Sequence, residues 1–482
     1  MALAEPAVAM DERHFAHTVV TGAKRPPGDT RSANAAASTL SFVVNSMGNV
    51  LCILLLACTF TADLRATETP VASGHANDSR HEVQQAAPVT DELSAPQLAI
   101  VTFGPGTLSW ERFGHNAIVV DDPADGTRLT YNYGVFDFLE KNFLLNFVLG
   151  RMHYILAARP LDEDLAVYVG EGRSVTVQVL NLTPGQARHL AAFLAWNAQP
   201  KNAGYRYDYF VNNCSTRVRD ALNQALGGAL ERQLAGRSAP HSYRSDAVRL
   251  ISADFWSALG MDMGLGPKAD GPLSLWQESF VPMVLSASLR DVVVTDASGR
   301  ALPLVSDEQV VSTGELPPPP AASPELRLPF LAAGIGFGAL LLWLARGAGH
   351  LYRVSFRVLA VAWWLICGLS GLALAGLWGL TDHWAAWDNE NLLLLNPLCL
   401  LLPVMWLRTP RIARGLATLI AAAALLTLII RALPGLYQDN LAFIALAVPV
   451  HLILAVLAWR QCSLVGAPPT AVPPRSERRL VS

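Results

Sequence analysis

Residues 212–217 read Asn212-Asn213-Cys214-Ser215-Thr216-Arg217 and mark the start of an expected helix. Asn213 is a favoured N-cap residue, which puts Cys214 in the first helical turn. The next apolar residues are spaced for one buried helix face, and Gly227-Gly228 ends the helix. A thiol at a helix N-terminus meets free backbone N–H groups and the positive end of the helix dipole. Both favour thiolate, the nucleophilic form of cysteine.

A cysteine nucleophile needs a base, and a histidine lies upstream at the start of an expected strand. This strand is part of Phe113-Gly114-His115-Asn116-Ala117-Ile118 and pairs in an expected hairpin with residues 129–134. His115 is therefore the candidate base. Asn132, on the second strand, is the candidate that orients the imidazole, with Tyr131 and Tyr133 as competitors.

Further polar residues could complete such a site. Asn213 and Ser215 are candidates for oxyanion support, although the Cys214 backbone amide is the simpler donor and Asn213 is also explained as a cap. Arg112 and Arg217 are candidates for binding a lipid headgroup. A solvated or paired arginine is the plain alternative for both.

The composition limits the class of protein. Of the 482 residues, 52% are hydrophobic and only 16% are charged. Soluble domains carry about 25% charged residues, so an ordinary soluble enzyme is excluded. The net charge is −3, so the chain lacks the excess of basic residues that is typical of nucleic-acid-binding proteins. The six cysteines show no CxxC or Cys/His ligand spacing, and we expect no metal and no cofactor.

The N-terminal segments indicate export. Residues 1–39 are polar and basic, typical of a disordered cytoplasmic tail, or of a gene-model artefact if Met47 is the true start. Residues 40–62 are apolar and fit a transmembrane anchor, a cleaved signal peptide or a lipoprotein signal ending at Cys58. Each of the three would export the domain on its C-terminal side. Residues 66–96 have the composition of a linker.

The rest of the chain divides into an exported part and a membrane part. Residues 98–315 have mixed polarity and can form one domain, followed by a proline-rich linker at 316–327. Residues 328–459 contain five apolar runs, each near the ~20 residues that cross a bilayer. The tail, 460–482, is rich in arginine, and we expect it to be cytoplasmic.

The distribution of charge predicts the orientation of the membrane part. Arginines gather in alternate loops, whereas the loop at residues 381–391 contains no Lys or Arg. The positive-inside rule then places this loop outside, on the side of the exported domain. His383 and Asn391 in or beside it are candidates for lipid or substrate binding.

These motifs resemble the periplasmic domain of the Lnb-type apolipoprotein N-acyltransferases. That domain is similar to circularly permuted papain-like folds of the lecithin:retinol-acyltransferase-like class, in which histidine precedes cysteine. The resemblance extends to residues 270–274, 280–282, 381–383 and 391–393, and covers most of 98–460. It implies an α+β exported domain of this class, followed by an all-α membrane domain of about five helices in the bacterial inner membrane.

The resemblance also implies a chemistry. A thiol acyltransferase of this kind takes an acyl chain from a membrane phospholipid as a thioester on Cys214. His115 moves protons while the chain passes to the N-terminal amine of a lipoprotein. Two alternatives stay open: a periplasmic cysteine peptidase or amidase of the cell wall, and a non-enzymatic membrane-tethered binding or sensory module. The five apolar runs argue against the peptidase or amidase. If the Cys214→Ser substitution left function intact, the non-enzymatic module would be favoured.

Overall fold

The structure is a computed structural model that describes residues 95–137, 140–433 and 438–465, with side chains as far as 460. These residues belong to one compact unit. The predictions for 1–39, for 40–62, for nearly all of 66–96 and for the tail beyond 465 lie outside the described residues.

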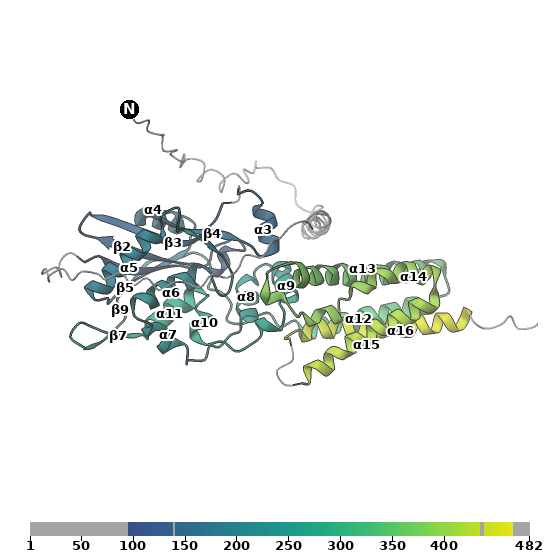
Figure 1. Cartoon of the computed structure of the whole chain (residues 1–482). Coiled ribbons are helices and arrows are strands. Elements are labelled where there is room, and N and C mark those ends of the chain that lie inside the picture. Colours follow the sequence, from purple (N-terminus) through teal and green to yellow (C-terminus); the bar gives the residue numbers. More distant parts are fainter. Residues whose placement is uncertain (1–94, 138–139, 434–437, 466–482) are drawn as a thin grey trace, which may run out of the picture. The chain divides into compact units, whose positions relative to one another are not determined.

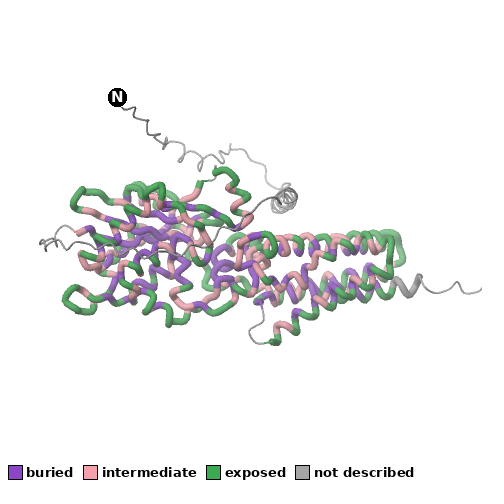
Figure 2. The backbone as a smooth tube through the Cα atoms, in the orientation of Figure 1, coloured by how far each residue is buried: buried purple, intermediate pink, exposed green. Residues whose placement is uncertain are grey.

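The exported part is built on an antiparallel sheet of seven strands in the order β6-β4-β3-β2-β1-β5-β9. The strands are β1 (Gln97–Phe103), β2 (His115–Asp122), β3 (Thr127–Val135), β4 (His153–Pro160), β5 (Ser174–Leu180), β6 (Gly204–Arg206) and β9 (Val305–Thr313). A separate hairpin joins β7 (Val293–Thr295) to β8 (Ala301–Pro303). The expected hairpin is β2–β3, with Ile118 opposite Tyr131. Figure 2 shows the inner strands buried along most of their length.

Short helices cover both faces of this sheet (Figure 1). They are η2 (Glu111–Phe113), α3 (Phe143–Leu149), α4 (Leu161–Gly170), α5 (Pro184–Asn197), α6 (Cys214–Ala225), α7 (Ala229–Leu234), α8 (Tyr243–Ile251), α9 (Phe255–Gly264), η3 (Pro267–Ala269), α10 (Leu275–Glu278) and α11 (Pro282–Leu289).

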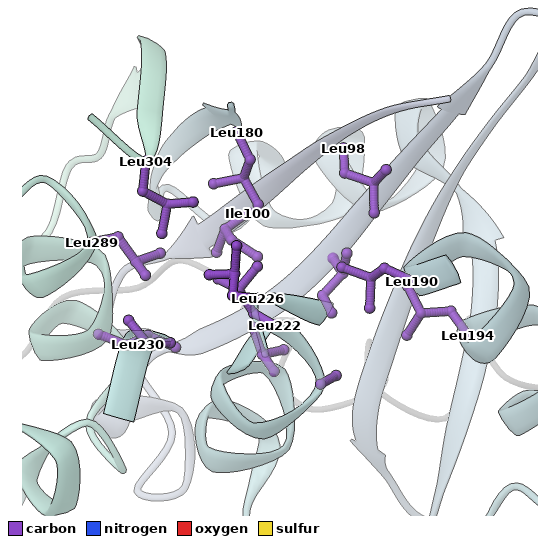
Figure 3. Packing of buried hydrophobic residues seen from close by; sticks show 14 of the residues in the cluster. Leu98, Ile100, Leu180, Leu190, Leu194, Leu222, Leu226, Leu230, Leu289 and Leu304 are labelled. Atoms are coloured by element: carbon purple, nitrogen blue, oxygen red, sulfur yellow. The ribbon is translucent and has the colours of Figure 1, made fainter. Parts of the chain in front are cut away.

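The main core lies between one face of the sheet and helices α5, α6 and α11. Figure 3 shows Leu98 and Ile100 of β1 packed with leucines of the helices: Leu190 and Leu194 of α5, Leu222 of α6, Leu226 directly after α6, and Leu289 of α11. Removing such side chains from water is the main stabilising term for the domain, about 25 cal/mol per Å² of apolar surface. A second, smaller cluster packs Leu161 of α4 on the opposite face, against Val101 and Val119.

The membrane part contains five segments long and apolar enough to cross a bilayer. Four are single helices: α12 (Arg327–Arg346), α13 (His350–Leu380), α15 (Pro410–Arg431) and α16 (Leu441–Val465). The third segment is broken into η5 (Glu390–Leu393), η6 (Pro397–Leu401) and α14 (Leu402–Arg408). Asn396 caps η6 by accepting a hydrogen bond from the Leu398 backbone. The side-chain oxygen of Asn396 is therefore satisfied within its own segment.

The loop after α13, which also holds η4 (Trp384–Ala386), lies against the sheet domain. Asp382 accepts hydrogen bonds from Arg151 at 3.0 Å and from Arg206 at 2.6 Å. The Trp384 indole donates to Asp208 at 2.8 Å. Asp208 belongs to the turn that leads into α6, because its other oxygen accepts from the backbone of that turn. The expected outer loop of the membrane part thus supports the segment that carries the cysteine.

Candidate active site

Cys214 is the first residue of α6, where the sequence placed it. The helix start is held by a reciprocal capping box between Asn213 and Thr216. The thiol is buried, and backbone N–H groups of Asn116, Ser215 and Cys214 itself stabilise its thiolate form. The helix start therefore supplies the donors expected from the sequence.

The helix start favours thiolate, as expected, but burial of the site opposes it more strongly. Burial raises the pKa of the Cys214 thiol to about 11, outweighing the backbone donors that lower it. Burial likewise lowers the pKa of His115 to about 4, against a hydrogen bond to Asn132 that raises it. Both groups are consequently neutral near pH 7. The pair is therefore arranged for proton transfer during attack rather than for a resting ion pair.

His115 lies at the first position of β2, and its partner is the predicted one. The Nε2 atom of His115 lies 3.0 Å from Oδ1 of Asn132 on β3. The Nδ2 group of Asn132 donates to the Asp164 carboxylate at 2.6 Å. An ionised carboxylate only accepts, so the Asn132 amide must direct its NH₂ group to Asp164 and its oxygen to His115.

This arrangement assigns the proton on the imidazole. Because Asn132 offers His115 an acceptor, Nε2 of His115 carries the hydrogen and donates it. The other nitrogen, Nδ1, is then the unprotonated one and is free to take a proton. Asp164 acts through Asn132 and is a positioning residue in this chain of hydrogen bonds.

His115 and Cys214 share their surroundings. The residue directly after His115, Asn116, gives its backbone N–H to the thiol. Arg173 lowers the pKa of both His115 and Cys214 by its charge. Tyr168 lies beside the imidazole, with 6.1 Å between ring centroids, and feels the charge of Cys214. The structure thus brings the predicted base and nucleophile to one place, between β2 and the start of α6.

Asn213 and Ser215 flank the nucleophile, with their side chains committed to other contacts. The Asn213 amide donates to the carbonyls of Tyr209 at 3.0 Å and Phe280 at 2.8 Å, in addition to its cap. The Ser215 hydroxyl donates to the Ser279 carbonyl at 2.6 Å. Both side chains fasten the helix start to the chain before α11, and the donors left near the sulfur are backbone amides.

The remaining candidates lie further out. Arg217 stacks over the Tyr205 ring at 4.5 Å, and Arg112 in η2 is half-buried. His383 gives its Nε2 hydrogen to the Phe147 carbonyl at 3.1 Å. Asn391 is fully buried and donates to the Met263 carbonyl. The structure brings none of these four into hydrogen-bond contact with Cys214 or His115, and their lipid-binding role stays a prediction.

Sequence reasoning did not find Asp164 and Arg173. Asp164 follows two other acidic residues at the start of α4, and no local pattern distinguishes the buried one. Arg173 is buried beside the site, donates to the Gly104 carbonyl at 2.8 Å and stacks over Tyr168. Arginines are mostly exposed, and no residue near Arg173 in the sequence distinguishes it from a surface arginine.

One cluster in the described residues has the geometry of metal ligands: His241, Asp246 and Glu278. These side chains already make close contacts with one another and with an arginine. His241 Nδ1 lies 2.8 Å from Glu278, and Arg249 lies 2.6 Å from Asp246. The two buried carboxylates thus already face cationic or protonatable partners, and this cluster is separate from Cys214.

Comparison with known proteins finds matches to two family models. The model of the Lnb N-terminal periplasmic domain matches residues 84–252, which include His115, Asn132, Asp164 and Cys214. The model of the Lnb transmembrane domain matches residues 328–462, which include the five candidate membrane segments apart from the first residue of α12. No curated protein and no solved structure matches the chain.

Proposed function

Because this chain belongs to the Lnb family, with both the periplasmic and the transmembrane domain of that family, we propose that it is a thiol acyltransferase. It moves a fatty acyl chain from a membrane phospholipid, through a thioester on Cys214, to the N-terminal amine of a bacterial lipoprotein. The periplasmic domain works at the outer face of the inner membrane. Its fold is of the circularly permuted papain-like class, with the histidine strand before the cysteine helix.

One observation carries this proposal: a cysteine at a helix start beside a histidine whose tautomer is set by a buried amide and carboxylate. The chain runs from His115 to Asn132 at 3.0 Å and on to Asp164 at 2.6 Å. A nucleophile, a base and a group that orients the base are the parts that covalent acyl transfer requires. An inert buried cysteine would need none of them.

The first half-reaction follows from the neutral pair. As the Cys214 sulfur attacks the ester carbonyl carbon, Nδ1 of His115 takes the thiol proton. The developing oxyanion is stabilised by backbone N–H groups at the start of α6. When the tetrahedral intermediate collapses, the ester oxygen leaves with the proton from His115, giving a lyso-lipid and a thioester.

The second half-reaction reverses these roles. The amine of the acceptor attacks the thioester carbon, and His115 takes a proton from the amine. The carbon–sulfur bond breaks, an amide forms, and His115 returns the proton to the sulfur. Donor and acceptor are both anchored in the membrane. Attachment of the catalytic domain to the membrane part therefore keeps the site near both substrates. The Asp382 and Trp384 contacts provide that attachment.

The decisive experiment is mass spectrometry of lipoprotein N-termini in a strain that depends on this protein for N-acylation. We expect Cys214→Ala to remove the N-linked acyl chain and the acyl–enzyme thioester. The matched control is Cys367→Ala, a buried cysteine of the membrane cluster, which should retain both. An N-acyl chain that persists with stably expressed Cys214→Ala protein would refute the proposal. Cleavage of cell-wall peptide by the wild type, without any thioester, would favour a peptidase instead.

A further inference from the structure

We propose that α3 (Phe143–Leu149) inserts into the outer leaflet of the membrane that holds the C-terminal helices, and that lipid reaches the thiol beside it. Its role in lipid delivery rests on the proposed function, whereas its insertion does not. The occupant of this surface is the lipid bilayer itself.

The first argument is the surface of α3. Its sequence is Phe-Leu-Leu-Asn-Phe-Val-Leu, without any charged residue, and none of its residues is buried. Leu144 is 59% exposed, Leu145 42% and Phe147 41%. Soluble proteins seldom leave such a contiguous apolar patch in water unless it binds something. A short apolar helix beside membrane spans is expected to lie in the interface.

The second argument is where α3 lies. The Phe147 carbonyl accepts from the His383 ring at 3.1 Å, and the Leu149 carbonyl accepts from the Asp382 backbone at 2.8 Å. Asp382 and His383 lie two and three residues after α13, a 31-residue candidate span that ends at Leu380. The polar residues after a span mark the depth of the bilayer surface. The C-terminal end of α3 is therefore held at that depth.

A second apolar site lies on α9 and strengthens the same orientation. Its first residues, Phe255 and Trp256, are exposed. Further along the helix, Leu259 and Met263 pack against the core of the membrane part. Two apolar segments of the sheet domain, far apart in sequence, thus contact or adjoin the membrane part.

The third argument is a row of aromatic rings that leads from α3 towards the nucleophile. Phe147 contacts Tyr209 with 6.4 Å between ring centroids, and Tyr209 contacts Tyr207 at 5.8 Å. Gly134 separates Tyr207 from Cys214, since a Cβ atom on this glycine would lie 3.6 Å from the Tyr207 ring and 3.4 Å from Cys214 Cβ. Aromatic side chains therefore connect α3 with the surroundings of the thiol, and an acyl chain that enters beside α3 would pass along them.

The insertion is tested with full-length protein in nanodiscs. A fluorophore on Leu144→Cys is quenched by doxyl-labelled phospholipid if α3 lies in the leaflet. The control is Val310→Cys, which is 57% exposed on β9, at the opposite edge of the sheet from β6. Cys52, Cys58 and Cys462 are replaced in both variants, and the parent without an introduced cysteine gives the background.

We expect lipid quenching at position 144 to exceed that at position 310 at least about threefold. Equal quenching at the two positions would overturn the proposal. Protection of position 144 from aqueous iodide without quenching by lipid would also overturn it, and would indicate a protein on this surface.

A second measurement separates this inference from the proposed function. Leu144→Glu should slow thioester formation from bilayer phospholipid about tenfold, because a charge in the leaflet is costly. Its rate with a short, soluble nitrophenyl ester should stay within about twofold of the wild type. Equal slowing with both substrates would contradict delivery by α3. If the wild type forms no thioester with either substrate, the proposed function fails while the quenching result still decides the insertion.

Discussion

The substitution Asp164→Ala tests the tautomer argument directly. The wild-type carboxylate receives the Asn132 NH₂ group at 2.6 Å, which turns the amide oxygen to His115. Without the carboxylate, one hydrogen of this NH₂ group loses its acceptor, and the group keeps only its longer bond to the Thr130 carbonyl, at 3.4 Å. Rotation of the amide exchanges that longer bond for one to Nε2 of His115, to which the NH₂ group then donates. That nitrogen must now accept, so the proton moves to Nδ1 and the base is lost. Arg159, 3.3 Å from Asp164 in the wild type, becomes free to attract the rotated oxygen.

The size of the effect follows from the cost of the unrotated amide. A buried N–H donor without a partner costs about 1–3 kcal/mol. At about 1.36 kcal/mol per tenfold change, the fraction of productive enzyme falls roughly 5- to 150-fold. Substrate binding does not involve this group, so we expect kcat to fall by this factor with KM nearly unchanged.

The assay is single-turnover thioester formation by the full-length protein, with thermal unfolding measured in parallel. Asp164→Asn is the conservative control, because its amide oxygen can still accept from Asn132, and it should retain activity within about fivefold of the wild type. The reasoning is refuted if folded Asp164→Ala keeps the wild-type kcat. It is refuted equally if folded Asp164→Asn is as slow as the alanine variant.

Three further results are expected. A His115 pKa of about 4 keeps the base neutral above that pH, so thioester formation should stay level down to about pH 5 and be halved near pH 4; a fall near pH 6.5 would contradict this. A Cys214 pKa of about 11 means that iodoacetamide should alkylate this thiol about tenfold faster per pH unit from pH 7 to 10, whereas a pH-independent rate would reveal a preformed thiolate. In α13, Gly371→Ala should destabilise the membrane part by about 1–3 kcal/mol, because the new methyl group collides with the Leu395 carbonyl. Gly376→Ala on the same helix meets open space and should be neutral in detergent melting experiments.

The parts of the site that depend on nearby residues could be predicted from the sequence. The start of α6 is encoded by Asn213 and Thr216, three residues apart, whose side chains and backbones cap each other. The β2–β3 hairpin follows from two strand-forming runs, 117–120 and 129–134, on either side of a turn rich in Asp and Gly. These two elements were enough to propose Cys214, His115 and Asn132 as neighbours.

The parts that depend on distant packing could not be predicted. Asp164 lies 32 positions after Asn132 in the sequence, and their contact requires α4 to pack on the sheet. No short stretch of sequence indicates this packing. The effect of burial on the pKa of Cys214 could not be predicted for the same reason. The helix start can be inferred from a few residues, whereas the burial that outweighs it is contributed by the whole domain.

The bonds that fasten the start of α6 also impose an order on biogenesis. The Asn213 amide is held by the Phe280 carbonyl and the Ser215 hydroxyl by the Ser279 carbonyl, over 60 residues downstream. Asp208, in the turn before the helix, is bound by Trp384, which lies even further along the chain, in the loop after α13. A nascent chain that has only exported its cysteine and histidine therefore lacks the supports that set their geometry. Reactivity should appear only after the membrane segments are in place, which protects the cell from a loose acyl-accepting thiol during translocation.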